Sequence, residues 1–213
     1  MQYIFSSHKH NDYYSPSNQY CTTLQPNTKL TSLPSRGTPT GQSIKIASNT
    51  IEAYVATPQA HNAHPKTAIL FLPDVIGIWQ NSQLIADQLA ANGYYTLIPD
   101  LFNGDQLSLN RPDGFDLMAW LTKGTGGNNG HTWEFVDPIV EKSIKYLKEQ
   151  GFERIGSVGY CFGAKYVVRF LKEGGGIDVG FVAHPSYVLP FLFPLRSTLS
   201  SPFSLPSFYI EIY

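Results

Sequence analysis

The 213-residue sequence predicts an α/β domain in which a mostly parallel β-sheet carries helices on both faces. Two observations lead to this prediction. Short apolar runs alternate along the chain with amphipathic stretches of helical period, which is the order that βαβ units produce. Apolar residues also make up 42% of the chain, which is enough to fill the core of one domain of this size.

Several segments have the composition of strands. The first alternates apolar and polar residues before Pro58, as a half-exposed strand does. The next is a continuous apolar run closed by Pro73 and Asp74, which is typical of a strand covered on both faces. A later run, closed by Pro99 and Asp100, repeats this pattern. The predicted strands are 51–56, 68–72, 95–98, 154–158 and 179–183.

The segments between these strands have helical spacing. The first carries Leu84, Ile85 and Leu89 on one face and stops at the Asn92-Gly93 pair. The third has a long apolar stripe that runs from Val136 to Leu147. The predicted helices are 82–91, 113–121, 133–149 and 164–171.

The two ends of the chain differ from the part between them. Residues 1–36 are polar and show neither the helical nor the strand period of apolar residues. We therefore expect a largely disordered leader, with order beginning at the turn signal of residues 37–41. Residues 189–213 hold four prolines and five serines but only two charged residues, and the prolines leave no room for a regular helix or central strand. We therefore expect one incomplete domain over 37–188, followed by a Pro/Ser-rich apolar tail.

Composition and charge argue against several classes of protein. The net charge is −1 and charged residues make up only 15% of the chain, so no nucleic-acid partner is predicted. No apolar run reaches the length of a membrane span, and the first residues lack the apolar core of a secretory signal. We expect Cys21 and Cys161 to be free thiols in the cytoplasm. Neither a cofactor nor a metal site is predicted.

The strongest chemical signal is the segment Gly159-Tyr160-Cys161-Phe162-Gly163, which lies between a predicted strand and a predicted helix. This is the spacing of a nucleophile elbow, with cysteine in place of the commoner serine. The glycines allow close backbone contacts, and the following helix N-terminus favours a thiolate. A buried cysteine in a glycine-flanked turn is the structural alternative. The strand-elbow-helix context favours the nucleophile.

Further motifs make the chain resemble the dienelactone hydrolases, a branch of the α/β-hydrolases, over roughly residues 37–188. The similar segments are Leu70–Gly77, Pro99–Asp105, Gly159–Ala164 and His184–Ser186, together with Cys21 and the Gly37–Gly41 turn of fungal members. The resemblance implies an α/β-hydrolase fold and hydrolysis of a small ester or lactone.

The resemblance also implies roles for individual residues. Cys161 would be the nucleophile, and the backbone N–H groups of Val75 and Phe162 would form the oxyanion hole. Asp74 stands where family members keep a glutamate that communicates with the cysteine, and it could equally cap a turn. His184 could contact substrate or serve packing. Gly104 stands near the place of an arginine that binds a substrate carboxylate, so an anionic lactone is not supported.

The rest of the triad is not found after Cys161. The family places its acid and then its histidine beyond residue 200, where this chain has the Pro/Ser-rich tail. We therefore expect the last strands and helix of the fold to be missing, through truncation or a misplaced exon boundary. We also expect weak hydrolysis or none. The alternative is a non-catalytic relative that binds a small molecule or protein partner. A redox role is disfavoured because the chain has no Cys-x-x-Cys.

Overall fold

The computed structural model of the chain describes residues 2–6 and 37–186, and the described strands form one seven-stranded sheet. Their spatial order is β1-β7-β6-β4-β5-β3-β2. The strands are β1 (Gln2–Ser6), β2 (Gln42–Ile46), β3 (Ile51–Ala56), β4 (Thr67–Leu72), β5 (Tyr95–Pro99), β6 (Arg154–Tyr160) and β7 (Val179–Ala183).

Five of these strands run in the same direction. The neighbours β5, β4, β6 and β7 are parallel, whereas β3 pairs antiparallel with both β2 and β5, and β1 pairs antiparallel with β7. Only β3 and β1 are therefore reversed, and the predicted mostly parallel sheet is confirmed. The carboxyl ends of β4, β6 and β7 meet at one edge, which is where open α/β sheets bind their ligands.

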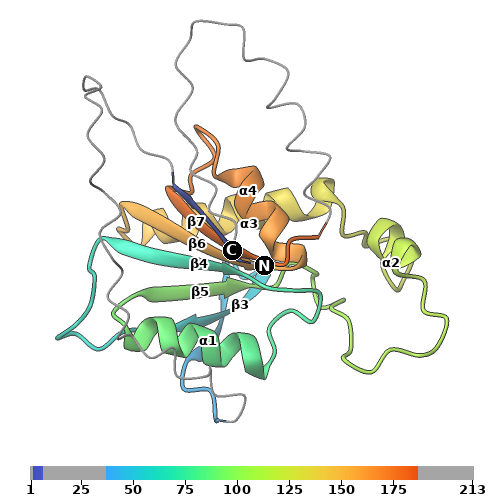
Figure 1. Cartoon of the computed structure of the whole chain (residues 1–213), viewed down its shortest axis with the longest axis horizontal. Coiled ribbons are helices and arrows are strands. Elements are labelled where there is room, and N and C mark those ends of the chain that lie inside the picture. Colours follow the sequence, from blue (N-terminus) through green and yellow to red (C-terminus); the bar gives the residue numbers. More distant parts are fainter. Residues whose placement is uncertain (1, 7–36, 187–213) are drawn as a thin grey trace, which may run out of the picture.

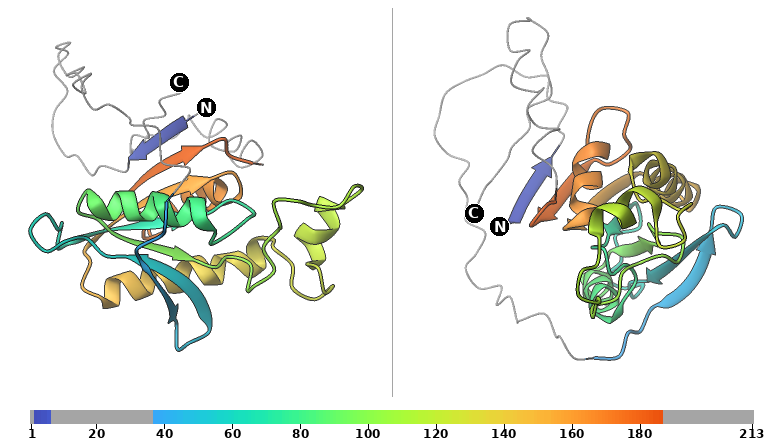
Figure 2. Two further views of the ribbon diagram at one scale, coloured as in Figure 1. Left: turned by 90° about the horizontal axis from the view of Figure 1, so that it is seen from below. Right: turned by 90° about the vertical axis from the view of Figure 1, so that its right-hand side faces the viewer.

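Helices cover both faces of the sheet, as predicted (Figure 1). The helices are α1 (Gln80–Ala91), α2 (Leu117–Lys123), α3 (Trp133–Glu149) and α4 (Phe162–Phe170). Helix α1 lies on one face, α3 and α4 lie on the other, and α2 stands apart from the sheet (Figures 1 and 2). None of the helices in the described ranges is long and apolar enough to cross a membrane.

The core has two parts, one on each side of the sheet. The larger one joins the sheet to α3 and α4 through apolar side chains such as Leu70, Val140 and Val167. The smaller one lies under α1, where Ile85 and Ala86 pack near Phe71. Burial of this apolar surface on both faces explains why the central strands are continuous apolar runs.

Two strands were not predicted from the sequence. Strand β2 pairs with β3, and an ion pair of 2.8 Å between Lys45 and Glu52 joins the two strands across the ladder. Strand β1 lies within the expected leader and pairs with β7 at the sheet edge (Figure 2). The remaining leader residues and the tail lie outside the described residues, so those two expectations stay predictions.

Candidate active site

Cys161 lies at the sharp turn between β6 and α4, in a backbone conformation that is rare for a residue with a side chain. Its φ is 49° and its ψ is −106°. A positive φ in a non-glycine residue costs free energy and persists only where the surrounding structure imposes it. The thiol is free and partly exposed. The sequence-predicted elbow is therefore present in the fold, with its strand, turn and helix in the expected order.

The two glycines of the elbow are required by close contacts. A Cβ at Gly163 would lie 2.1 Å from the carbonyl oxygen of Leu72, and a Cβ at Gly159 would lie 2.7 Å from the Cα of Ala164. Both distances are shorter than real Cβ atoms tolerate. The glycines thus let α4 begin directly against β4 and β6, which fixes the cysteine at the edge of the sheet.

Hydrogen bonds tie the elbow to the ends of the neighbouring strands. The N–H of Gly163 donates to the carbonyl of Pro73 (3.0 Å), just after β4. On the other side, the N–H of Cys161 donates to the carbonyl of Ala183 (3.1 Å), and the N–H of Ser186 donates to the carbonyl of Cys161 (3.1 Å). Three strand ends are therefore locked around the thiol.

Two backbone N–H groups at this edge are open. Phe162 is the first residue of α4, so its N–H has no carbonyl one turn earlier within the helix. Val75 follows β4, and its carbonyl accepts from the N–H of Leu107 (2.8 Å). Within the described part of the chain, neither the N–H of Phe162 nor that of Val75 donates a hydrogen bond. Both donors are therefore unpaired among the described residues, at the positions predicted for an oxyanion hole.

Asp74 makes a turn beside these donors. Its Oδ1 accepts from the N–H of Ile76 (2.9 Å), and its carbonyl accepts from the N–H of Gly77 (3.0 Å). Burial raises the pKa of Asp74, while the hydrogen bond from Ile76 and the charge of His184 act in the opposite direction. The carboxylate therefore holds the loop that carries Val75, and it interacts electrostatically with His184.

His184 is exposed just after β7 and also has a positive φ, of 38°. Its ring lies 6.0 Å from the ring of Tyr160, centroid to centroid. The structure thus brings Cys161, Phe162, Val75, Asp74 and His184 to the same edge of the sheet, at the ends of β4, β6 and β7.

Asp100, which follows β5, accepts hydrogen bonds from the backbone of the next turn. Its two carboxylate oxygens accept from the N–H of Phe102 (2.9 Å) and the N–H of Gly104 (2.6 Å), and the residue is only 7% exposed. Gly104 has a φ of +84°, and a Cβ added there would meet no atom within 4 Å. A side chain at position 104 would therefore face open space among the described residues.

An acid–histidine pair that the sequence did not reveal lies nearby. The Nε2 of His131 is 2.9 Å from the Oδ2 of Asp105, and His131 is only 1% exposed. Burial lowers the pKa of His131, against the influence of Asp105. Burial would raise the pKa of Asp105, but hydrogen bonds with Thr125 and His131 outweigh it and lower that pKa. The ring of Phe102 packs against both His131 and Phe162.

Lys165 is a second residue that sequence reasoning missed. It lies one turn after Cys161 on α4, and its Nζ is 4.0 Å from the centroid of the Phe162 ring. The side chain is partly buried. Lys165 follows Cys161 by four residues, and residues at this spacing share a helix face.

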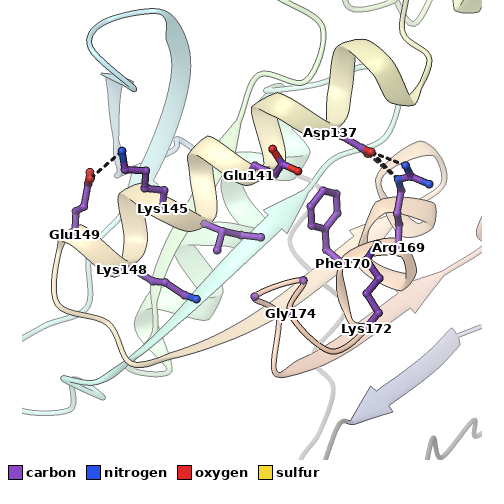
Figure 3. Close-up of a pocket in the computed structure, with 12 residues that line it drawn as sticks. Asp137, Glu141, Lys145, Lys148, Glu149, Arg169, Phe170, Lys172 and Gly174 are labelled. Atoms are coloured by element: carbon purple, nitrogen blue, oxygen red, sulfur yellow. Dashed lines mark hydrogen bonds and ion pairs between the residues drawn. The ribbon is translucent and has the colours of Figure 1, made fainter. Parts of the chain in front are cut away.

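A groove on the described structure lies away from the elbow. This groove of about 660 Å³ runs between α3 and α4 and is lined by Glu141, Lys145, Lys148, Arg169 and Lys172, among others (Figure 3). Its walls carry charges of both signs, and Cys161 is not among them. We therefore place the candidate site at the elbow, where the strained cysteine and the open N–H groups are, and not in this groove.

Comparison with known proteins identifies the family of this chain. The model of the dienelactone hydrolase family matches residues 51–203. The match covers most of the chain and includes every strand from β3 to β7 and the Cys161 elbow. The chain belongs to the dienelactone hydrolase family.

Fungal relatives have substantial sequence identity to the chain. Hydrolase pyvD of Aspergillus violaceofuscus is 46% identical over 142 residues, which cover 66% of this chain and 54% of that protein. Dienlactone hydrolase 1 of Gibberella moniliformis is 38% identical over 159 residues, covering 72% and 58%. The chain thus spans little more than half the length of these curated relatives.

Solved structures of similar proteins are more distant. The dienelactone hydrolase-like promiscuous phosphotriesterase P91 from metagenomic libraries is 14% identical, with a TM-score of 0.48. The likeness covers 65% of this chain and 56% of that one.

Proposed function

We propose that this chain carries the acyl-accepting half of a cysteine-dependent hydrolase that cleaves small esters or lactones. The observation that carries the proposal is the strained conformation of Cys161 at the end of β6, beside two open N–H groups. Nucleophiles of α/β-hydrolases occupy this turn because it holds the attacking atom clear of the sheet. Family membership supports the same reaction class.

The proposed reaction begins with attack by the Sγ of Cys161 on the carbonyl carbon of the ester. The N–H groups of Phe162 and Val75 would stabilise the oxyanion of the tetrahedral intermediate. As the C–O bond breaks, the alcohol leaves with the proton that the thiol has lost, and a thioester remains on Cys161. Asp74 would contribute by holding the loop of Val75. Its direct influence on the cysteine, and a contact of His184 with substrate, stay predictions.

Hydrolysis of the thioester needs a base to activate water, and we propose that this step is slow in this chain. His184 is the only histidine after Cys161 in the sequence. General acid–base assistance typically contributes about 10²–10⁴-fold to such a step. The thioester should therefore accumulate. A cytoplasmic location fits this proposal, because a nucleophilic thiol has to remain reduced.

The test is the reaction of the full chain with p-nitrophenyl acetate. The expected result is a burst of close to one equivalent of p-nitrophenol per chain, followed by slow turnover. The variant Cys161→Ala should lose the burst. An equal burst from Cys161→Ala would contradict the proposal.

The second candidate is a non-catalytic family member that binds a small molecule or a protein partner. It is favoured because no histidine among the described residues forms a hydrogen bond with the thiol of Cys161. A chain that shows no burst although iodoacetamide alkylates Cys161 would support this candidate over the hydrolase.

A further inference from the structure

His184 and Cys161 occupy equivalent positions at the ends of two neighbouring strands. Strands β6 and β7 are parallel, and their last paired residues are Tyr160 and Ala183, which directly precede Cys161 and His184. The N–H of Cys161 donates to the carbonyl of Ala183 (3.1 Å), just before His184. The carbonyl of Cys161 accepts from the N–H of Ser186 (3.1 Å), two residues after His184. Because neighbouring strands lie about 4.8 Å apart, the backbone of His184 is held beside that of Cys161.

Both residues have a backbone conformation that is rare outside glycine. The φ angle is 49° at Cys161 and 38° at His184. Such a conformation costs free energy and persists only where the surrounding structure imposes it. Burial of the ring does not account for it at position 184, because His184 is exposed. Strained residues cluster at active sites, so the conformation of His184 indicates a role at the surface beside the thiol.

The ring of His184 is accessible to water. Within residues 2–6 and 37–186, its side chain makes no hydrogen bond or ion pair. The ring centroid lies 6.0 Å from that of Tyr160. Asp74 interacts electrostatically with His184, but the Oδ1 of Asp74 accepts from the N–H of Ile76 (2.9 Å). A neutral imidazole has one ring nitrogen that can accept a proton, and in His184 this nitrogen can bind a water molecule.

Other titratable side chains near the elbow are less suited to accept a proton from water. His131 is 1% exposed and is bonded to Asp105 at 2.9 Å. The Nζ of Lys165 lies 4.0 Å from the centroid of the Phe162 ring, and an ammonium group has no lone pair to accept a proton. His184 is therefore the exposed base that the described structure offers at the ends of β6 and β7.

We propose that His184 is the general base of thioester hydrolysis at this site. A ring nitrogen of His184 takes a proton from a water molecule while the oxygen of that water attacks the carbonyl carbon of the acyl group on Cys161. The C–S bond of the tetrahedral intermediate then breaks, the carboxylic acid leaves with the oxygen of the water, and the sulfur takes the proton back from His184. No acid orients the ring through a hydrogen bond among the described residues, so the step remains slow.

The test measures the lifetime of acetylated Cys161 in the full chain, with Cys21→Ser as background. The chain is acetylated briefly with p-nitrophenyl acetate, the excess ester is removed, and loss of the acetyl group is followed by mass spectrometry. Asparagine tolerates a positive φ but cannot take the proton, so His184→Asn should lose the group about tenfold more slowly than the wild type. The burst of p-nitrophenol should be unchanged, because His184 acts after acylation.

Two further variants distinguish a base from a structural residue. His61→Asn removes an exposed histidine from the connection before β4, at the opposite end of the sheet, and should leave the lifetime unchanged. His184→Gly suits the positive φ and leaves room for free imidazole. Imidazole should therefore shorten the lifetime by a larger factor in His184→Gly than in His184→Asn.

Three results would overturn the inference. They are an unchanged lifetime in the His184 variants that circular dichroism shows to be folded, an equal increase in His61→Asn, and a longer lifetime that imidazole does not shorten preferentially in His184→Gly.

The inference rests on the proposed function in taking Cys161 as the nucleophile, but the two fail in different ways. A burst that depends on Cys161, followed by a lifetime that does not depend on His184, would retain the nucleophile and overturn the base alone. Absence of the burst in the wild type would overturn both.

Discussion

The elbow of Cys161 and the pair of Asp105 and His131 lie close together in the fold but differ in how far their polar groups are satisfied. Cys161 is partly exposed and strained, and the N–H groups of Phe162 and Val75 at the same sheet edge have no partners among the described residues. His131 is 1% exposed, bonded to Asp105 and enclosed by the rings of Phe102 and Trp120. Exposure and unmet hydrogen-bonding capacity therefore distinguish the elbow, which we propose is the reactive region, from the buried pair.

The largest effect is expected from Gly163→Ala. The added Cβ would lie 2.1 Å from the carbonyl oxygen of Leu72, so α4 must move away from β4. The free energy of unfolding should fall by about 3 kcal/mol, and alkylation of Cys161 should slow. Urea denaturation measures the first effect. Gly126→Ala, whose Cβ meets nothing closer than 3.4 Å, is the matched control and should change stability by less than about 0.5 kcal/mol.

The variant His131→Ala tests the other side of the comparison. It removes a buried ring and leaves Asp105 without one of its partners, which should reduce the free energy of unfolding by about 2–3 kcal/mol. The rate at which iodoacetamide alkylates Cys161 should stay within about twofold of wild type. A large loss of thiol reactivity with little loss of stability would show instead that His131 contributes to the reactivity of Cys161.

The pH dependence of stability should also separate the two regions. Burial lowers the pKa of His131, so the unfolded chain binds a proton near pH 6.5 that the folded chain excludes. The contribution of neutral His131 to the free energy of unfolding is complete above about pH 6.5, and it is lost as the pH falls below that value. Thermal or urea denaturation at pH 7.5 and 5.5 should show a loss of about 1 kcal/mol in wild type. The loss should be smaller in His131→Ala. Asp105 does not contribute to the change in stability between pH 7.5 and 5.5, because its pKa is lowered and it stays ionised over this range.

The smallest effect concerns the strain at the elbow. The φ of 49° at position 161 suits glycine better than any residue with a Cβ. Cys161→Gly should therefore be more stable than Cys161→Ala by about 1 kcal/mol, although both lack the thiol. Equal stabilities in urea denaturation would show that the elbow stores no strain.

The fold was largely predictable because each central strand is an apolar run closed by a turn and each main helix has a regular stripe. Helix α3 begins and ends at the predicted residues, 133 and 149. Strand β2 was missed because a short edge strand with exposed polar positions lacks such a signal. Helix α2 begins four residues later than predicted, at Leu117, since Asp116 caps its N-terminus.

The candidate site was predictable where it follows local sequence, as in the elbow. Contacts between distant segments near the site were not predictable. Nothing local to Asp105 or His131 announces that the two pair across 26 positions.

The most direct test of the central claim is to locate the acetyl group on the chain after brief reaction with p-nitrophenyl acetate. Proteolysis and mass spectrometry should find one acetyl group on the peptide that contains Cys161, and neutral hydroxylamine should remove it, because thioesters are labile to that reagent. That result would establish Cys161 as the nucleophile. An acetyl group spread over lysines, stable to hydroxylamine and unchanged in Cys161→Ala, would contradict it.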